Sequence, residues 1–548
     1  MKKRKFSLRL FLIFIITFLF ISFIHISFNA TIIARQPSPN WSRGIEVTTT
    51  PFTREIVAGM TSERDILIIA PIKDGKEILK ITKLNKDMQI KEEYEASIDK
   101  FNINTITSDD IQLIGNNLYW RDNKESALYT STLDDASKRF GEVVKLNENV
   151  VDFQVAEDAR YLVVVLSGGK VALYKEQGGE YIELEGPSDL SNIQMVNIIT
   201  NNDTIYLQTA IYNEENSNKE VYITEYKDNK WAKSVYMTSL LEVKNQIKDI
   251  ELAVDEDYVY SISSVQGDDK TSYTYLINGY SKDTKESFEE IKAKWAIDLK
   301  VQYFSSKPVI FDSEEEGLTV FTTAPSNLDV RATSSNVIKL NLTKDGFKSA
   351  ELVSNTKKWS NQVVVLRDNN TDYVLWNESG GFGSTIIMGT SNDRTVIENH
   401  ANITTKDIKD AIAEEVPHIV NLLIVSVGAR LFSIFPSIIW LLCMFMWNSA
   451  MEKRYNLYLI IGMIIHLIFQ AISIDFYYGK SYIMPDFLTL NLVKHMIPFL
   501  FAALAGIVSY IYKKEADEPQ SYKVYALFIV YYHIFINYLF VPYLFNAN

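Results

Sequence analysis

Three histidines lie within apolar stretches near the C-terminal end of the chain. Each has a carboxamide residue four positions away, and residues four apart in a helix share one face. Ionisable residues in membrane-spanning helices usually face the interior of the helix bundle. We therefore expect three inward-facing polar stripes. The pairs are His466 with Gln470, His495 with Asn491, and His533 with Asn537.

The three histidines are expected at similar depth in a membrane. Each lies nine to twelve residues from the outer end of its apolar segment, which is roughly 14–18 Å at ~1.5 Å per residue. That distance is close to the midplane of a bilayer. Lys494 adds a positive charge in the same layer, whereas Arg430 is expected near the outer interface, where a long side chain reaches polar surroundings. The candidate cavity residues are Arg430, Gln470, Asn491, Lys494 and Asn537.

Three kinds of chemistry fit these stripes. In the first, they form hydrogen bonds between helices and only hold a bundle together. In the second, His466, His495 and His533 ligate a transition metal or a haem iron, and the amides orient them. In the third, the stripes line a polar cavity for a substrate, a proton or a lipid headgroup. The residue types alone do not separate these three hypotheses.

The elements that carry the stripes are predicted membrane spans. Residues 1–9 form a basic leader, and residues 10–29 form an apolar segment typical of a signal anchor with a cytoplasmic N-terminus. Ala30 and Ala34 provide small-residue contexts for cleavage as a signal peptide, which is the alternative. In both cases the next part of the chain is exported.

Four more spans are predicted within residues 428–548. Their connecting loops hold Lys453 and Arg454 in one case and residues 512–523 in another, and basic loops stay on the cytoplasmic side. This places the C-terminus and the large central segment outside the cytoplasm. The predicted spans are residues 428–448, 456–475, 487–512 and 523–545.

Charge and cysteine usage describe the exported segment. The whole chain has a net charge of −13, and residues 30–416 hold 42 basic and 62 acidic side chains. This acidic surface excludes nucleic acid as a partner and suits a basic protein partner or a loosely held cation. The single cysteine, Cys443, lies in a predicted span. A large exported domain without disulfides is more typical of a bacterial envelope than of eukaryotic secretion.

A hairpin pattern recurs through the exported segment. Each copy has a short apolar strand, an acidic or Asn-rich turn, and a second strand of β-branched or aromatic residues. The second strands of seven copies begin 43 to 60 residues apart. Several hairpins are followed by another, which makes four strands per repeat. Clear copies are residues 153–165, 197–209, 250–262, 309–321 and 364–376.

This pattern resembles the β-propeller repeat proteins at the level of architecture. The resemblance implies an all-β propeller of about seven four-stranded blades, with six to eight as the range, over residues 53–402. An array of stacked sandwiches is the alternative. Residues 30–52 are the predicted linker, in which residues 44–50 are suited to add a strand to the last blade and close the ring. Residues 403–427 read as an amphipathic juxtamembrane helix, with Ile408, Ala411, Ile412 and Val416 at helical spacing.

The exported segment has few groups for catalysis. Residues 26–399 contain no histidine and no cysteine, which excludes Ser-His-Asp triads, Cys-His pairs and common zinc sites there. Carboxylates are abundant, so a hydrolase or lyase that uses them is a weaker alternative. We expect a membrane-anchored binding or scaffold protein, whose propeller recognises a protein or another extracytoplasmic envelope ligand. The main rival is a membrane enzyme or transporter with its site among the histidine–amide stripes.

Overall fold

The architecture was analysed on a computed structural model of the 548-residue chain. It divides into two compact units. A propeller unit contains Gln36–Asn327 and Ala332–Ala401, and a helical unit contains Met1–Arg35 and Asn402–Asn548. The structure describes residues 2–50, 56–72, 78–102, 106, 110–241, 246–267, 272–293, 295–297, 300–302, 304–312, 317–325, 335–356, 358–381, 384–428, 431–478, 484–516 and 519–545.

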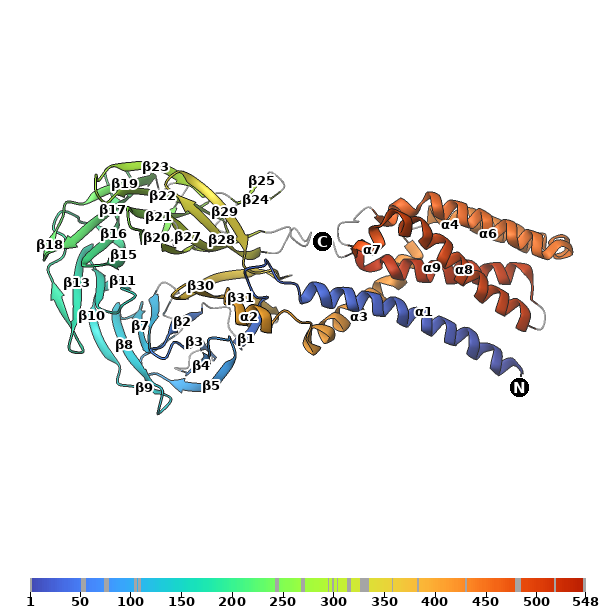
Figure 1. Ribbon diagram of the computed structural model, residues 1–548, viewed down its shortest axis with the longest axis horizontal. Helices are drawn as coiled ribbons and strands as arrows, with labels where there is room; N and C mark the ends of the chain where they lie inside the picture. The colour runs from blue at the N-terminus through green and yellow to red at the C-terminus, as the bar shows by residue number, and fades with distance from the viewer. Residues whose placement is uncertain are drawn as a thin grey trace. The chain divides into compact units, whose positions relative to one another are not determined.

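The propeller unit is a ring of seven blades (Figure 1), as the sequence predicts. Blade 1 has β2 (Val57–Met60), β3 (Ile66–Pro71), β4 (Ile78–Leu84) and β5 (Ile90–Ser97). Blade 2 has β6 (Ile111–Ile114), β7 (Asn117–Asp122), β8 (Ala127–Asp134) and β10 (Val144–Glu148), with β9 (Arg139–Phe140) pairing β8. Blade 3 has β11 (Val150–Val155), β12 (Tyr161–Leu166), β13 (Lys170–Gln177) and β14 (Glu180–Leu184).

The next three blades repeat this order of strands. Blade 4 has β15 (Ile193–Asn201), β16 (Thr204–Asn213), β17 (Asn218–Lys227) and β19 (Val235–Leu241), with β18 (Lys230–Trp231) beside β17. Blade 5 has β20 (Gln246–Val254), β21 (Tyr258–Gln266), β22 (Tyr273–Ser281) and β23 (Ser287–Lys292). Blade 6 has β26 (Val309–Asp312), β27 (Leu318–Pro325), β28 (Ser335–Thr343) and β29 (Gly346–Leu352), and the hairpin of β24 (Trp295–Ile297) and β25 (Lys300–Gln302) lies between blades 5 and 6 in the chain.

The last blade is completed from the N-terminal side of the chain. It has β30 (Ser360–Asp368), β31 (Thr371–Gly381) and β32 (Ser384–Ser391), and its outermost strand is β1 (Ile45–Thr50). β1 pairs antiparallel with β32, with Thr48 opposite Ile387. The expectation that residues 44–50 close the ring is therefore confirmed. Helix α2 (Arg394–Asn399) follows β32.

Apolar side chains fill every interface between neighbouring blades. The second strand of each blade alternates, so that successive residues face opposite neighbours. In β7, Leu118 and Trp120 pack toward blade 1, whereas Tyr119 packs toward blade 3. Between blades 7 and 1, Val47 of β1 packs in the same cluster as Ile66 and Leu375. The core is thus seven separate apolar layers, which explains why each hairpin is apolar on both faces.

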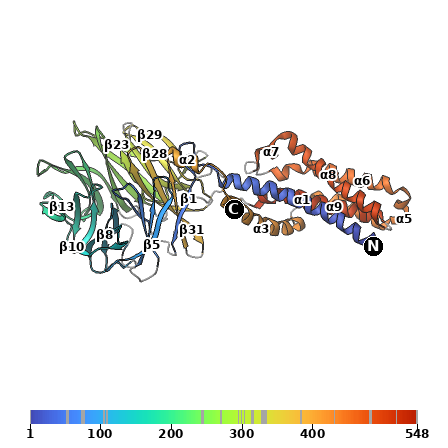
Figure 2. The ribbon, with the colours of Figure 1, turned by 60° about the horizontal axis from the view of Figure 1, so that its bottom comes forward.

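The helical unit contains ten helical segments in the described part of the chain. The longer ones pack around the last helix, which is mostly buried, and Figure 2 shows the first helix running beside it. The segments are α1 (Lys2–Ile33), α3 (Thr405–Gly428), α4 (Leu431–Met446), α5 (Asn448–Met451), η2 (Glu452–Arg454), α6 (Tyr455–Ile472), η3 (Ile474–Tyr478), α7 (Asp486–Thr489), α8 (Asn491–Glu515) and α9 (Ser521–Phe545).

Four helical stretches in the described residues are long and apolar enough to cross a membrane. They are Leu8–Ile33, Asn448–Tyr478, Asn491–Glu515 and Ser521–Tyr543, and Ile434–Met446 is a shorter apolar helix. Large apolar side chains project outward from α1, α6 and α8, for example Phe23, Ile472 and Leu492. Such exposed apolar surface suits contact with lipid. The predicted span at 428–448 corresponds to the shorter helix.

Candidate functional site

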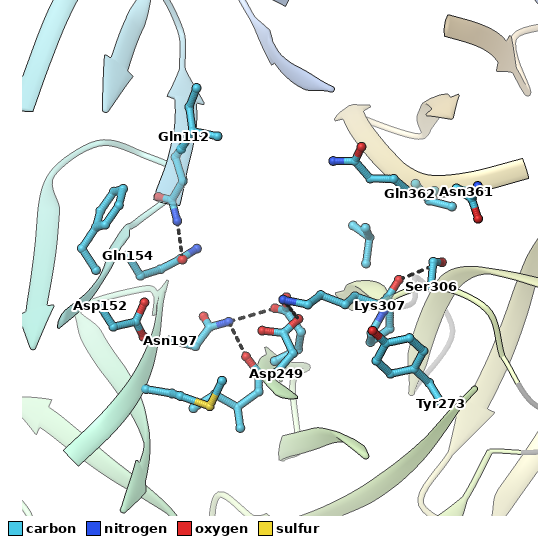
Figure 3. Close-up of a pocket in the computed structure, with 18 of the residues that line it drawn as sticks. Gln112, Asp152, Gln154, Asn197, Asp249, Tyr273, Ser306, Lys307, Asn361 and Gln362 are labelled. Carbon is cyan, nitrogen blue, oxygen red and sulfur yellow. Dashed lines mark hydrogen bonds and ion pairs between the residues drawn. The ribbon is translucent and has the colours of Figure 1, made fainter. Parts of the chain in front are cut away.

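The propeller unit has a pocket of about 760 Å³, which we call the channel pocket. Its lining comes mainly from the innermost strands of blades 2 to 5 and blade 7, and from the chain just before β26 of blade 6 (Figure 3). The volume lies within the roughly 300–1,000 Å³ that is typical of small-ligand sites. Its polar residues include Gln112, Arg121, Asp152, Gln154, Gln194, Asn197, Asp249, Glu251, Tyr273, Lys307, Asn361, Gln362, Asn377 and Glu378.

A β-bulge recurs in the innermost strands that line this pocket. The pairing register shifts between Val150 and Asp152 in β11 and between Ile193 and Met195 in β15. The same shift occurs in β20 before Asp249, and in β30 around Gln362, whose φ of 42° is left-handed. A bulge turns a side chain out of the regular alternation. It therefore directs polar side chains of four blades into the channel pocket.

Several pocket side chains also join neighbouring blades. The backbone N–H of Val155 donates to Gln112 Oε1 at 2.9 Å, and that of Val196 donates to Asp152 Oδ2 at 2.9 Å. Asn197 Nδ2 donates to the carbonyl of Ile250 at 3.1 Å. These hydrogen bonds satisfy strand groups that have no partner at the inner edge of a blade. Part of the polar lining is thus explained by ring assembly.

A side-chain hydrogen bond of the same kind joins blades 7 and 1, where the ring closes. The backbone N–H of Ile56 donates to Gln362 Oε1 at 2.8 Å, and Asn377 Nδ2 donates to the same oxygen at 2.8 Å. Gln362 is thereby held in its left-handed conformation by contacts to both blades. Gln362 therefore helps to hold blade 1 against blade 7.

The channel pocket has more carboxylates than cations. It holds Asp152, Asp249, Glu251 and Glu378 against two basic residues. Lys307 Nζ lies 3.7 Å from Asp249 Oδ2, and the other cation, Arg121, is engaged by Asp110 outside the lining, with Nε donating to Oδ1 at 2.6 Å. The pocket is therefore electrostatically suited to a positively charged ligand.

Burial changes the ionisation of two of these carboxyl groups. It raises the pKa of Asp152 to about 7, against the opposing effects of the Val196 N–H and the Arg121 charge. It also raises the pKa of Glu378, although the Trp376 indole N–H donates to Glu378 Oε1 at 2.9 Å. A buried carboxyl group whose pKa is shifted in this way is a candidate functional group.

Sequence reasoning did not single out the channel pocket. The sequence signal for it is an amide or carboxyl residue that recurs in the first strands of blades 2 to 5: Gln112, Gln154, Asn197 and Glu251. The acidic turns were more conspicuous, yet Asp255 in the turn after β20 is buried and structural. Its Oδ1 accepts from the Asp257 and Tyr258 N–H groups, at 2.8 and 2.6 Å. Residues 313–316 of the other acidic turn lie outside the described residues.

In the helical unit, the structure brings two of the three predicted histidines together. The rings of His466 in α6 and His533 in α9 are buried and perpendicular, with centroids 5.1 Å apart. His466 Nδ1 is 2.8 Å from Ser437 Oγ of α4, and its Nε2 has no hydrogen-bond partner among the described residues. A buried polar constellation therefore joins three helices.

His495 does not join this pair. It is exposed on α8, and its Nδ1 lies 2.8 Å from the carbonyl of Asn491, one turn earlier. The buried face of α8 carries Ile497, Phe501 and Ala505. His495 is on another side of the helix and is therefore exposed. Lys494 instead forms an ion pair with Asp475 and lies 5.1 Å from the Tyr478 ring centre. Arg430 lies outside the described residues.

The amides also differ from one another in their surroundings. Asn537 is buried and accepts a hydrogen bond of 2.7 Å from the Tyr477 hydroxyl, Gln470 is buried, and Asn491 is exposed. Among the residues that the structure describes, no group of three His, Cys, Asp or Glu side chains is arranged to hold a metal. A metal or haem role for His466, His495 and His533 stays a prediction, as does a carboxylate-dependent hydrolase or lyase.

The fold and the apolar helices define a class: a seven-bladed β-propeller that carries helices able to anchor it in a membrane. No family model and no curated protein sequence matches the chain. Among solved structures, the polysaccharide lyase Uly1 is similar with a TM-score of 0.42 and 11% identity, over 63% of this chain and 90% of that one. The hydrazine synthase of Kuenenia stuttgartiensis gives 0.36 and 12%, over 58% and 91%. Similarity at this level does not indicate a shared activity or ligand.

Proposed function

We propose that this protein is a membrane-anchored binding protein whose propeller captures a basic segment of an extracytoplasmic protein in the channel pocket. The observation that carries the proposal is the pocket itself. It is large enough to admit side chains, and its acidic residues outnumber its basic residues four to two. The acidic excess of residues 30–416 acts in the same direction, because it attracts cations over a longer range.

The recognition chemistry follows from the lining. A lysine or arginine side chain that enters the pocket would meet Glu251 as a charged acceptor and the amides of the inner strands as neutral ones. Asp152 is a second charged acceptor once it has ionised. Charge-assisted hydrogen bonds of this kind are about twice as strong as neutral ones. Asp152 ionises near pH 7, so its contribution to cation binding is largest above that pH.

The test is binding of labelled Lys/Arg-rich peptides to the full-length protein in detergent. Blocking variants Gln194→Arg and Asn361→Arg place a bulky cation at exposed positions that line the pocket. Neither residue provides one of the interblade hydrogen bonds described above. We expect each variant to weaken peptide binding at least about tenfold, which corresponds to ~1.4 kcal/mol.

The matched control is Gln177→Arg, the same substitution at an exposed position of β13 outside the pocket lining. It should leave binding within about twofold of the unaltered protein. Peptides with Glu in place of Lys and Arg should not bind. Equal loss of binding in all three variants would contradict the pocket assignment. Binding of neutral glycan fragments but of no basic peptide would reassign the ligand to a saccharide.

A second candidate is a membrane enzyme or transporter with its site at the His466–His533 pair. Contact between two buried histidines from different helices favours it. Metal and haem analysis of purified protein tests this candidate, together with His466→Leu and His533→Leu against the exposed control His495→Leu. Absence of any cofactor together with full function of both buried variants would exclude it.

A further inference from the structure

A second buried polar cluster in the helical unit joins both ends of the chain. Glu415 of α3 lies between two histidines, and these three residues form what we call the buried triad. Its Oε1 is 3.0 Å from His25 Nδ1 of α1, and its Oε2 is 3.3 Å from His418 Nδ1 of α3. The Tyr538 hydroxyl of α9 also donates to Glu415 Oε1. All four side chains are less than a tenth exposed.

The hydrogen-bond partners of the two His25 ring nitrogens indicate which of these nitrogens carries a proton. His25 Nε2 is 3.1 Å from the carbonyl oxygen of Leu539, which can only accept, so this nitrogen carries a proton. His25 Nδ1 faces Glu415, which already accepts from Tyr538. Each hydrogen bond that a carboxyl group accepts favours its ionised form. A proton on Nδ1 as well would give this contact its donor and would make His25 a cation beside the Glu415 carboxylate.

The surroundings of the triad explain why the pair must be neutral as a whole. Other titratable groups that face it are the hydroxyls of Tyr538 and Tyr543 from α9, and α1 adds Ser22, whose hydroxyl is 2.7 Å from that of Tyr538. A lone charge buried in such a site is strongly unfavourable. A counter-charge together with hydrogen-bond donors offsets that cost.

Helix α3 has the polarity expected of a helix that packs in lipid. Its buried side carries Glu415 and His418, whereas Ile412, Val416 and Val420 are 48%, 58% and 55% exposed. In water the apolar side of a helix faces the core. The helix begins with a hydrogen-bonded cap made by Thr404 and Asp407. Of the predicted apolar face, Ile408, Ile412 and Val416 are exposed, whereas Ala411 is buried.

We propose that His25, Glu415 and His418 form a proton-binding site inside the helical unit, in which the ring of His25 holds the bound proton and Glu415 is its counter-ion. The site needs α1, because His25 belongs to it. Two more contacts hold α1 against the other helices. Thr17 Oγ1 is 2.6 Å from the Tyr531 hydroxyl of α9, and Arg9 forms an ion pair of 2.7 Å with Glu515 of α8. Removal of α1 as a signal peptide would take away His25, the partner of Glu415.

The test is nitrogen-15 NMR of the full-length protein in detergent with labelled histidine. The chain has six histidines, so five single His→Gln variants assign His25 by elimination, even if His25→Gln does not fold. At neutral pH, we expect both ring nitrogens of His25 to carry a proton in the unaltered protein. Glu415→Gln should remove one of them, because the amide supplies no counter-charge, while the signals of the exposed His495 do not move.

Two results would overturn the proposal. The first is a singly protonated His25 in the unaltered protein, which would make the triad an uncharged hydrogen-bonded contact. The second is a His25 signal that is the same in Glu415→Gln and in the unaltered protein. Detection of a mature chain that begins after Ala30 or Ala34 would also exclude the site, because it would lack His25.

Discussion

At the scale of single residues, Asp152 combines a structural and a chemical role. Its Oδ2 accepts the Val196 N–H and thereby joins blades 3 and 4, while its side chain lines the channel pocket. Both roles follow from the bulge in β11, which turns Asp152 inward. Burial there favours the protonated carboxyl group over the carboxylate. This preference makes the stability of the propeller depend on pH.

We predict that Asp152→Asn removes part of that pH dependence. The pKa of Asp152 is about 7 in the folded protein and ~3.9 in an unfolded chain. Its stabilising contribution is therefore complete below pH ~4 and is lost as the pH rises to about 7. Asn keeps an acceptor for Val196 and does not ionise. Between pH 5 and 8, the unaltered protein should lose about 1–2 kcal/mol more than the variant, a value reduced for contact with solvent in the pocket.

Unfolding monitored by intrinsic fluorescence at both pH values provides the measurement. Asp283→Asn, in an exposed turn, is the control and should behave like the unaltered protein. A pH dependence that is the same in Asp152→Asn and in the unaltered protein would show that this carboxyl group is ionised on both sides of the range.

At the scale of elements, closure of the ring depends on β1. This strand lies more than 300 residues from its partner β32 in the sequence, and Val47 on its inner face is 4% exposed. Contacts this distant in the chain carry a large entropic cost of closure. They must therefore be compensated by burial of apolar side chains such as Val47 against Ile66 and Leu375.

We predict that Val47→Asp lowers the free energy of unfolding of the propeller by ~3 kcal/mol, because it buries an unpaired charge between blades 7 and 1. Thr49→Asp, on the exposed face of the same strand, should change it by less than ~0.5 kcal/mol. Denaturant unfolding of the full chain measures both values. Similar losses for the two variants would mean that β1 contributes backbone pairing but no core contacts.

At the scale of the whole molecule, acidic and basic residues are segregated along the chain. The acidic excess belongs to residues 30–416. The helical unit instead carries basic groups at one set of helix ends and turns: Lys453, Arg454, Lys513 and Lys514. Basic loops are retained on the cytoplasmic side during insertion. This pattern predicts a propeller outside the cytoplasm and basic loops inside.

Cysteine labelling tests this topology. In a Cys443→Ser background, which has no other cysteine, Gln177→Cys places a thiol on an exposed position of the propeller and Lys453→Cys places one in a basic loop. A membrane-impermeant maleimide should label Gln177→Cys in intact cells and Lys453→Cys only after lysis. The reverse pattern would place the propeller in the cytoplasm.

The sequence predicted the repeated hairpins, the seven blades and the closing strand. The hairpins and their number are local or periodic features, since each of the first six blades is one contiguous stretch of chain. The closing strand was predicted because an open ring leaves the last blade one strand short. It also predicted apolar helices near both ends of the chain, four of which are long enough to cross a membrane. The spacing of apolar residues and the length of apolar segments are enough to predict these strands and helices, because neither depends on tertiary packing.

Only the tertiary structure decided which polar residues meet. The channel pocket forms because bulges in separate blades direct side chains to one axis, and a bulge depends on pairing with the neighbouring strand. The buried triad joins His25 to Glu415, which lie 390 residues apart. His495 and His533 have the same local pattern, yet one is exposed and the other buried, because the packing of α8 and α9 determines which helix face is turned inward.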